Sequence, residues 1–410
     1  MSTYTEWSGG QMVRLSASGR GSKQGDVRAH NERLLLSLIR RHGSLTKAEI
    51  SRITGLSAQA ISVIMRRLEE DGLLHRGNVL RGKIGQPSTP MALADDGAFS
   101  LGVKIGRRSA ELVLIDFVGN VRNSMREAYA WPMPDAIIDF ARRGVTKIMS
   151  EMTPLQRERI AGLGIASPFD LWQWEAGIGS PSGAMDVWRS ADLVHSLDSD
   201  FPFPVYLQND ATAACGAEFV FGRGHEFTNY LYLFIGFFIG GGIVLNGGVF
   251  TGPSGNAGAI GSFPVIGQDG KAVQLIEVAS AANLEARIRA AGVDPSPMWK
   301  QPDGWSGFGE YIDGWIQDIA PYLANAIVGS CSVIDFSAVF IDGGFPADVR
   351  LRLVEATRNA LAKRDLQGLN PPELIEGTVG NQARAIGGAC LPFFDKFILT
   401  SMPMLNDGSY

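Results

Sequence analysis

Polar and basic side chains recur between residues 57 and 67, where helical periodicity would place them on one exposed face. The outward positions are short or polar at first and basic later: Ser57, Gln59, Ala60, Ser62, Arg66 and Arg67. Val63 also faces outward in this spacing. Short polar side chains at the start of a helix can approach base edges in a DNA groove, and arginines can hold backbone phosphates. The segment therefore predicts a DNA-binding surface.

A basic segment with glycine at its turns follows, HRGNVLRGKIGQPSTPMAL, from His75 to Leu93. Its composition is typical of a two-stranded hairpin, with Arg81 and Lys83 in the part between the strands. Cations in such a hairpin lie near the phosphate backbone or in the minor groove. We therefore expect this hairpin to be the wing of a winged helix-turn-helix domain.

Three short helices are needed to position these side chains. The first ends at His42-Gly43, and the second begins with a capping box formed by Thr46 and Glu49. Ser57 caps the third helix, whose expected core stripe is Ile61, Ile64, Met65 and Leu68. A helical bundle that contacts other proteins has a similar pattern. The tight spacing of the helices and the basic wing favour DNA binding.

The charge distribution supports the same interpretation. Residues 1–92 contain 14 Lys and Arg against 7 Asp and Glu, a balance of +7. The remainder contains 23 basic and 35 acidic residues, a balance of -12, so the net charge of -5 hides a basic head on an acidic body. A basic end of this kind indicates a polyanionic partner, although the charge alone does not distinguish DNA from other roles.

The sequence also lacks the features of a secreted or membrane-spanning protein. Residues 1–25 have no apolar core typical of a secretory signal, and we expect a disordered arm there. No apolar run approaches the roughly 20 residues that span a bilayer, so no membrane partner is expected. Cys215, Cys331 and Cys390 are far apart in apolar sequence. They indicate buried free thiols in a reducing cytoplasm.

From Phe99 onward, short apolar strands and glycine turns alternate with helical segments such as 135–151 and 211–221. Two strand-rich blocks of this kind predict a two-lobed α/β body with a ligand cleft between its lobes. A further helix over 307–328 could form an oligomer interface or pack on the second lobe, and packing is favoured.

Residues from about 29 to about 398 resemble the ROK family (repressor, open reading frame, kinase), which joins sugar kinases with winged-helix sugar-responsive repressors. The segments that carry the resemblance are GQPS (85–88), LGVKIG (101–106), GLGIASPFD (162–170), LQNDATAACGAEFVFG (207–222), GPSGNAGAIG (252–261), AVFIDGG (338–344) and GNQARAIGGA (380–389). The resemblance implies a winged helix-turn-helix domain over 26–94 and an actin-like, ribonuclease H-like body. Its first lobe would comprise 95–208 with 384–402, and its second lobe 209–383.

The resemblance also implies a sugar site. Asn209 and Asp210 match the family's sugar-binding pair, in which the aspartate is the catalytic base of the kinases, here expected to be vestigial. Glu277 matches a glutamate that binds sugar hydroxyls. Loop 183–188, beginning at Gly183, and Asn256 in loop 252–261 are expected to line the same cleft. Asn209-Asp210 could instead simply cap the helix that follows, but sugar contact is favoured.

The phosphate loops depart from the kinase pattern. The family's Asp-Ile-Gly-Gly-Thr loop is replaced by Lys104-Ile105-Gly106-Arg107-Arg108, and its Gly-Thr-Gly-Ile-Gly loop by residues 236–240, GFFIG. Lys104 stands where the family has its metal-binding aspartate, and Phe237 and Phe238 would crowd the γ-phosphate of ATP. Arg107 and Arg108 could pair with phosphate, but a solvated hairpin turn is the favoured interpretation. No ATP is therefore expected as a cofactor.

The family's structural zinc site is also missing from the sequence. Ala259 and Ser262 stand at the family's Glu and His positions, and IGQDGKAVQLIE (266–277) replaces its cysteine cluster. No tetrahedral set of soft ligands remains, so no zinc is expected. Two expected sugar contacts are lost as well. The ligand is therefore bound differently from a typical family sugar, or is a different compound.

These features lead to three alternatives. The favoured one is a transcription regulator, a repressor of carbohydrate genes, that binds operator DNA through its head and a sugar effector through its body. It would be a homodimer or homotetramer, because winged-helix proteins with one head per chain bind two-fold symmetric sites. No catalytic residue is expected in it. The others are an active ATP-dependent sugar kinase, and a ligand-independent DNA-binding protein whose body only dimerises.

Overall fold

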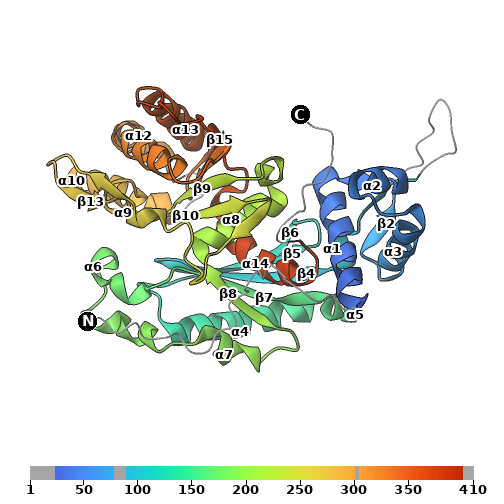
Figure 1. Cartoon of the computed structure of the whole chain (residues 1–410). Helices are drawn as coiled ribbons and strands as arrows, with labels where there is room; N and C mark the ends of the chain where they lie inside the picture. The colour runs from blue at the N-terminus through green and yellow to red at the C-terminus, as the bar shows by residue number, and fades with distance from the viewer. Residues whose placement is uncertain (1–23, 78–88, 301–303, 400–410) are drawn as a thin grey trace, which may run out of the picture. The chain divides into compact units, whose positions relative to one another are not determined.

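The structure is a computed structural model that describes residues 24–77, 89–300 and 304–399. The chain divides into two compact units (Figure 1). The first unit comprises Met1–Asp210 with Ala385–Tyr410, and the second comprises Ala211–Arg384. The chain therefore leaves the first unit within one helix and re-enters it within another.

The first unit begins with a three-helix domain and a small sheet. Its elements are α1 (Gln24–His42), β1 (Ser44–Leu45), α2 (Lys47–Thr54), α3 (Ala58–Glu70), β2 (Leu74–Arg76) and β3 (Met91–Leu93). The strands pair antiparallel in the order β1-β3-β2, as in a winged helix, which confirms the predicted head. Helix α1 begins at Gln24, inside the segment 1–25 predicted to be an arm. Arg81 and Lys83 lie outside the described residues.

Local sequence signals fix the helix ends in this head. The Thr46 hydroxyl accepts the Glu49 amide, and the Glu49 carboxylate accepts the Thr46 amide at 2.8 Å, so the predicted capping box is confirmed. Helix α2 ends at Gly55, whose φ of 70° suits a residue without Cβ. Ser57 Oγ accepts the Ala60 amide at 3.2 Å and caps α3. The predicted core stripe of α3 is buried.

The body of the first unit is a five-stranded sheet of order β6-β5-β4-β7-β8, in which β5 pairs antiparallel with its two neighbours and β4, β7 and β8 run parallel. The strands are β4 (Phe99–Ile105), β5 (Ser109–Asp116), β6 (Val121–Ala128), β7 (Ile160–Ser167) and β8 (Val205–Asn209). Strand β4 is buried on both faces, whereas the edge strand β6 alternates between partly buried and exposed residues. The helices are α4 (Pro134–Glu151), α5 (Pro154–Glu158), α6 (Glu175–Ile178), α7 (Leu193–Asp198) and α14 (Ala383–Lys396).

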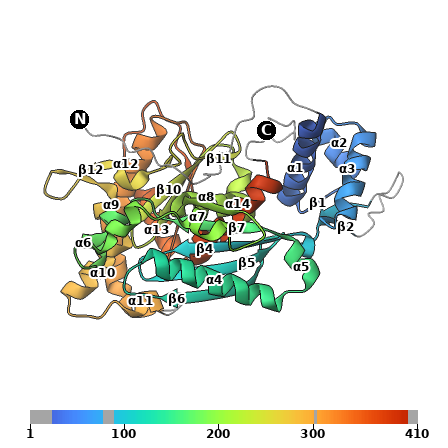
Figure 2. The same cartoon turned by 90° about the horizontal axis from the view of Figure 1, so that it is seen from below.

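Helices α4 and α14 cover opposite faces of this sheet (Figure 1, Figure 2). Helix α4 packs through Phe140 and Val145 on the strand residues of one apolar core. On the other face, α14 lies so close that a Cβ added at Gly164 would fall well inside contact distance of the Gly388 carbonyl oxygen. Glycine at both positions lets helix and sheet backbones meet directly.

The second unit repeats this strand order as β11-β10-β9-β14-β15. Its strands are β9 (Tyr230–Ile235), β10 (Ile239–Leu245), β11 (Gly248–Phe250), β14 (Ala338–Gly343) and β15 (Glu373–Glu376), with a separate hairpin of β12 (Pro264–Ile266) and β13 (Ala272–Gln274). Its helices are α8 (Asp210–Phe221), α9 (Leu275–Val278), α10 (Ala281–Ala290), α11 (Pro297–Lys300), α12 (Gly309–Cys331) and α13 (Ala347–Leu361). Two sheets with the same order confirm the predicted two-lobed α/β body.

Helix α12 packs on the second unit, which is the interpretation that the sequence favours. Ile312, Trp315 and Leu323 on this helix are buried in the core of the second unit, as the packing interpretation predicts. The three cysteines are free and buried, as predicted. Within the described residues, no helix is both long and apolar enough to cross a bilayer.

Candidate functional site

The outward face of α3 forms one continuous stripe. Gln59, Val63 and Arg66 are exposed along it, opposite the buried residues Ile61 and Ile64. Spacings of four and three residues place the side chains on successive turns of the same face. Ala60 and Ser62 flank the stripe and are partly buried. The predicted base-facing residues thus lie on one helix surface, with Gln59 in the first turn of α3.

Two of the predicted DNA-binding residues also have structural roles. Ser57 uses its hydroxyl oxygen as the cap of α3. Arg67 is directed toward acidic residues of the head: its Nε lies 3.8 Å from a Glu32 carboxylate oxygen and 3.6 Å from one of Asp71. The Asp71 pair has the local i,i+4 spacing, but sequence spacing did not reveal the Glu32 pair because Glu32 lies on a different helix. Arg66 is exposed and is the arginine of the stripe.

The head is attached to the first-unit body by specific contacts of α1. Ser37 is buried, and its Oγ accepts the Leu399 amide at 3.0 Å. The Arg40 guanidinium lies 5.0 Å from the centroid of the Phe117 ring, and desolvation by burial lowers the Arg40 pKa to about 10. A cation–ring contact and a buried hydrogen bond to a side-chain hydroxyl, both from one helix, join the head to segments far away in the sequence.

The predicted ligand-site residues of the first unit lie at element ends. Asn209 is the last residue of β8, and Asp210 is the first residue of α8; both are partly buried. The Asn209 amide donates to Gln208 Oε1 at 2.7 Å. Gly183 is exposed with a φ of 77°, and the loop after it is anchored by buried Met185 and Trp188. Strand β8 therefore delivers the Asn-Asp pair at its carboxyl end, where α/β sheets commonly bind ligands.

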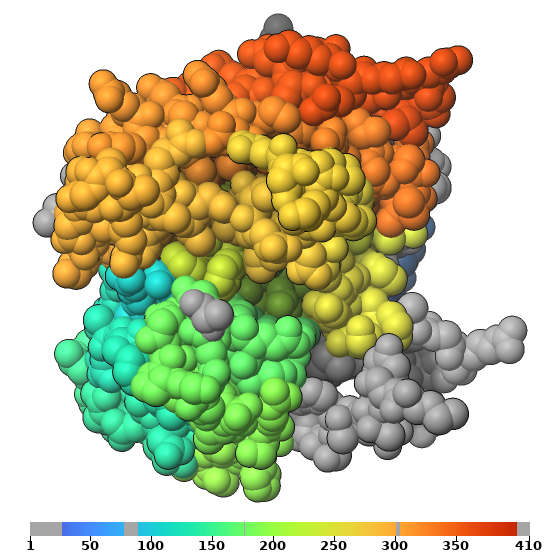
Figure 3. Space-filling view, turned by 90° about the vertical axis from the view of Figure 1, so that its left-hand side faces the viewer, coloured from blue at the N-terminus to red at the C-terminus, as the bar shows by residue number. Residues whose placement is uncertain are grey.

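The remaining predicted ligand residues belong to the second unit. Asn256 is exposed in loop 252–261, and Glu277 is exposed in α9; these segments belong to the yellow part of the surface in Figure 3. The Glu277 carboxylate accepts the Gln274 amide at 2.8 Å, so it caps α9. That cap occupies one lone pair of a carboxylate, which still leaves acceptor capacity toward ligand hydroxyls.

The first loop that departs from the kinase pattern contains a buried cation. Lys104 is only 6% exposed, and its Nζ donates to Glu111 Oε1 at 3.1 Å. Arg126 reaches the same carboxylate at 3.7 Å. A metal ion at this position would meet an ammonium group that already has an anionic partner. Arg107 and Arg108 are partly buried, so the turn is less solvated than predicted.

The second departing loop contains aromatic rings. Phe237 and Phe238 lie in the turn between β9 and β10, with ring centroids 4.7 Å apart. Phe237 also packs edge-to-face on Trp299 at 6.1 Å. Backbone amides that cradle a phosphate need small neighbouring residues, and two bulky rings here oppose that use. The aromatic contacts give both phenylalanines a packing role.

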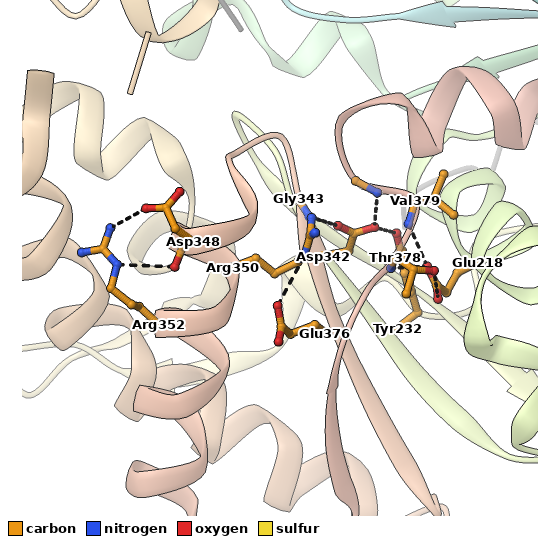
Figure 4. Close-up of polar contacts among 11 residues, drawn as sticks. Glu218, Tyr232, Asp342, Gly343, Asp348, Arg350, Arg352, Glu376, Thr378 and Val379 are labelled. Atoms are coloured by element: carbon orange, nitrogen blue, oxygen red, sulfur yellow. Dashed lines mark hydrogen bonds and ion pairs between the residues drawn. The ribbon is translucent and has the colours of Figure 1, made fainter. Parts of the chain in front are cut away.

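A buried polar network in the second unit was not anticipated (Figure 4). Glu218 accepts hydrogen bonds from the Thr378 amide and hydroxyl and from the Val379 and Arg223 amides, at 2.8 to 3.3 Å. Asp342 accepts from the Tyr232 hydroxyl, the Gly343 and Gly380 amides and Arg350. Both carboxylates have no exposed surface.

This network fixes the loop after β15 rather than forming a reactive centre. Burial is the largest influence on Glu218 and raises its pKa, against the effect of its hydrogen-bond donors. Each carboxylate already has four donors, which fills its ordinary acceptor capacity. In the sequence, only the position of two acidic residues, Glu218 and Asp342, within apolar segments could have indicated this network.

The residues of the family's zinc site do not suit a metal here. Ala259 and Ser262 offer no nitrogen or thiolate ligand. Burial raises the pKa of the Cys215 and Cys390 thiols, which opposes the thiolate form that binds zinc. Among the residues that the structure describes, no group of three or more His, Cys, Asp or Glu side chains is placed to hold a metal.

Comparison with known proteins agrees with this two-part architecture. Residues 100–284 match the ROK family, and residues 28–74 match the winged helix-turn-helix DNA-binding family. The chain carries a ROK family domain behind a winged helix-turn-helix head. The resemblance inferred from the sequence motifs is therefore confirmed.

Relatives of this chain extend over different parts of it. An uncharacterized protein of Sinorhizobium fredii, y4fQ, is 23% identical over 92% of this chain and 94% of its own length. The xylose repressor of Bacillus spizizenii is 24% identical over 58% of this chain and 61% of its own length. A crystal structure of a ROK family transcriptional regulator, a homolog of the E. coli MLC protein, aligns with a TM-score of 0.64 at 20% identity. It covers 91% of this chain and 98% of its own, and it shows the shared fold.

Proposed function

We propose that this protein is a sugar-responsive DNA-binding transcription regulator, a repressor of genes for carbohydrate uptake or catabolism. The observation that carries the proposal is the exposed Gln59–Val63–Arg66 stripe on a capped helix of the winged helix-turn-helix head. The names of its relatives, a xylose repressor among them, support the choice of a sugar as effector. Effector binding would favour one of two states of the protein that differ in DNA affinity.

The effector is proposed to contact the residues that the sequence predicts for the ligand site, which are Gly183, Asn209, Asp210, Asn256 and Glu277. Carboxylates and amides at element ends are suitable partners for sugar hydroxyls. Because the family's Glu and His are Ala259 and Ser262 here, fewer side chains accept hydrogen bonds from the ring. The ligand class is therefore a sugar or a sugar derivative with fewer polar contacts than a typical family substrate.

We further propose that the body binds its effector without ATP, without zinc and without catalysis. Lys104 paired with Glu111, and Phe237 packed on Trp299, do not suit a metal-bound triphosphate. A coupled assay of ADP release over a panel of sugars tests this directly. Turnover that disappears in the Asp210→Asn variant would contradict the proposal and favour a sugar kinase.

The regulator proposal itself is tested by enriching genomic fragments on the purified protein. We expect a palindromic operator, because a homodimer or homotetramer presents two heads related by symmetry. Arg66→Ala should weaken binding to all sequences and reduce the salt slope by about one unit, while Gln59→Ala should change the base preference. Arg28→Ala, an exposed arginine on α1, is the matched control. Failure to enrich any sequence would contradict the proposed sequence-specific binding of DNA.

A thermal-shift screen with sugars, with and without Mg-ATP, tests the effector. Stabilisation by a sugar alone supports the regulator, because a ligand that binds only the folded state raises the melting temperature. Stabilisation that requires Mg-ATP would favour the kinase. If no sugar stabilises the protein, a DNA-binding protein whose body only dimerises is favoured instead.

A further inference from the structure

The centre of the α3 stripe is an apolar side chain. Val63 is 61% exposed, and among the described residues it is the one large apolar side chain exposed on this helix. It lies between Gln59, one turn earlier, and Arg66, one turn later. Glu70 continues the same stripe, but its carboxylate would repel phosphates, so the DNA-facing part ends at Arg66.

Helix stability does not explain valine at this position. Valine is β-branched and forms helices less well than alanine, arginine or glutamine. The core of the head is built on the opposite face of α3, so Val63 gains nothing from burial there. Its neighbours on the stripe are the polar residues Gln59 and Arg66. A single exposed apolar residue is ordinary on a protein surface. What distinguishes Val63 is its place on the face that would meet the bases.

Major-groove edges present one apolar group, the 5-methyl of thymine. Apolar side chains recognise it by contact, whereas amide side chains such as that of Gln59 hydrogen-bond to adenine. We propose that Val63 is a specificity-determining residue that packs against the methyl group of a thymine in each operator half-site. This inference rests on the proposed DNA-binding function and adds the base that this position reads.

The geometry also predicts where that thymine lies. One helical turn advances about 5.4 Å, against about 3.4 Å for one base-pair step. The thymine read by Val63 is therefore one or two base pairs from the base read by Gln59. A protein partner on this face is disfavoured, because one valine between polar side chains is far smaller than a stable interface of about 800 Å² per partner.

Replacing single thymines by deoxyuridine in the enriched operator tests the proposal. This change removes only the methyl group and keeps every hydrogen bond of the base pair. Wild-type protein should lose affinity about fourfold at one thymine position per half-site, the effect of one buried methyl-sized group. Val63→Ser should bind the two DNAs equally, and Val63→Ile should still distinguish them.

The controls separate this inference from the proposed function. Val27→Ser alters another exposed valine, on α1, and should keep the thymine preference. If an operator is enriched and Gln59→Ala changes its preference, but no thymine is sensitive to deoxyuridine, the Val63 inference alone is wrong. The same conclusion follows if Val63→Ser is as sensitive as wild type. If no operator is enriched, the proposed function fails with it.

Discussion

At the scale of single residues, the most demanding feature is Glu218, a carboxylate with no exposed surface. Its cost of desolvation is offset by four hydrogen bonds from Arg223, Thr378 and Val379. The Thr378 and Val379 amides belong to the loop after β15, so one side chain of α8 holds a segment 160 residues later in the chain. Removing it leaves buried donors without an acceptor.

Glu218→Ala is therefore expected to lower the free energy of unfolding by about 3 kcal/mol, the cost of buried donors left unpaired. Urea unfolding followed by fluorescence measures it. Glu226→Ala is the control, because its pair with Arg223 is exposed and contributes at most about 1 kcal/mol. Equal losses in the two variants would show that the buried hydrogen bonds do not stabilise the unit.

At the scale of secondary-structure elements, helix ends and backbone contacts decide the arrangement. Helix α2 depends on the reciprocal bonds of Thr46 and Glu49, which any short peptide of this sequence could form. Helix α14 depends instead on a contact between Gly164 and Gly388, which lie in different segments of the first unit. The first is a local effect and the second is tertiary.

Glu49 makes the stability of α2 dependent on pH. Hydrogen bonds from the Thr46 amide and hydroxyl lower the Glu49 pKa below its ordinary 4.5. The stabilisation is therefore present above about pH 4.5 and is lost as the pH falls through the lowered folded value. Protection of the α2 amides against hydrogen exchange, corrected for intrinsic rates, should decrease at low pH in wild type. The dependence of this protection on pH should be weaker in the Glu49→Gln variant. Parallel pH profiles in the two proteins would show that Glu49 is not the cause.

The contact of α14 with the sheet predicts a strong effect of one added methyl group. Gly164→Ala should force α14 away from β7 and destabilise the protein by about 2 kcal/mol or more. Gly307→Ala is the control, because a Cβ there meets no atom within 4 Å. Thermal unfolding of the two variants measures the difference. A Gly164→Ala melting temperature equal to that of the control would exclude the close approach.

At the scale of the whole molecule, α1 joins the DNA-binding head to the first-unit body. The Ser37–Leu399 hydrogen bond and the Arg40–Phe117 contact link this helix to the end of the described chain and to the turn after β5. A regulator needs such a connection, because an effector can change DNA affinity only if head and body share two states. A freely moving head would bind DNA without responding.

Arg40→Ala combined with Ser37→Ala should therefore retain DNA binding but reduce the effect of sugar on it. The ratio of the Kd values with and without effector should approach one. Arg28→Ala, on the same helix but exposed, should leave that ratio unchanged. Titration of labelled operator by fluorescence anisotropy provides the measurement. An unchanged ratio in the double variant would show that α1 does not transmit the response.

Sequence patterns predicted the features that depend on residues close together in the sequence, within a few helical turns. The Thr46–Glu49 box, the Ser57 cap and the buried stripe of α3 follow from residue type and spacing alone. The Lys104–Glu111 pair was not predicted, because it requires the register of the β4–β5 hairpin. The predicted roles of the ligand residues stay predictions, and Glu277 proves to cap a helix as well.

The sequence by itself determined a winged helix-turn-helix head and a two-lobed α/β body, because periodicity, caps and glycine turns act over short distances. Only the tertiary structure decided that Arg67 turns to Glu32, that Glu218 holds the Thr378 loop, and that Gly164 of β7 meets Gly388 of α14. These facts depend on which distant segments meet and which faces stay uncovered. Local spacing limits such outcomes but does not choose among them.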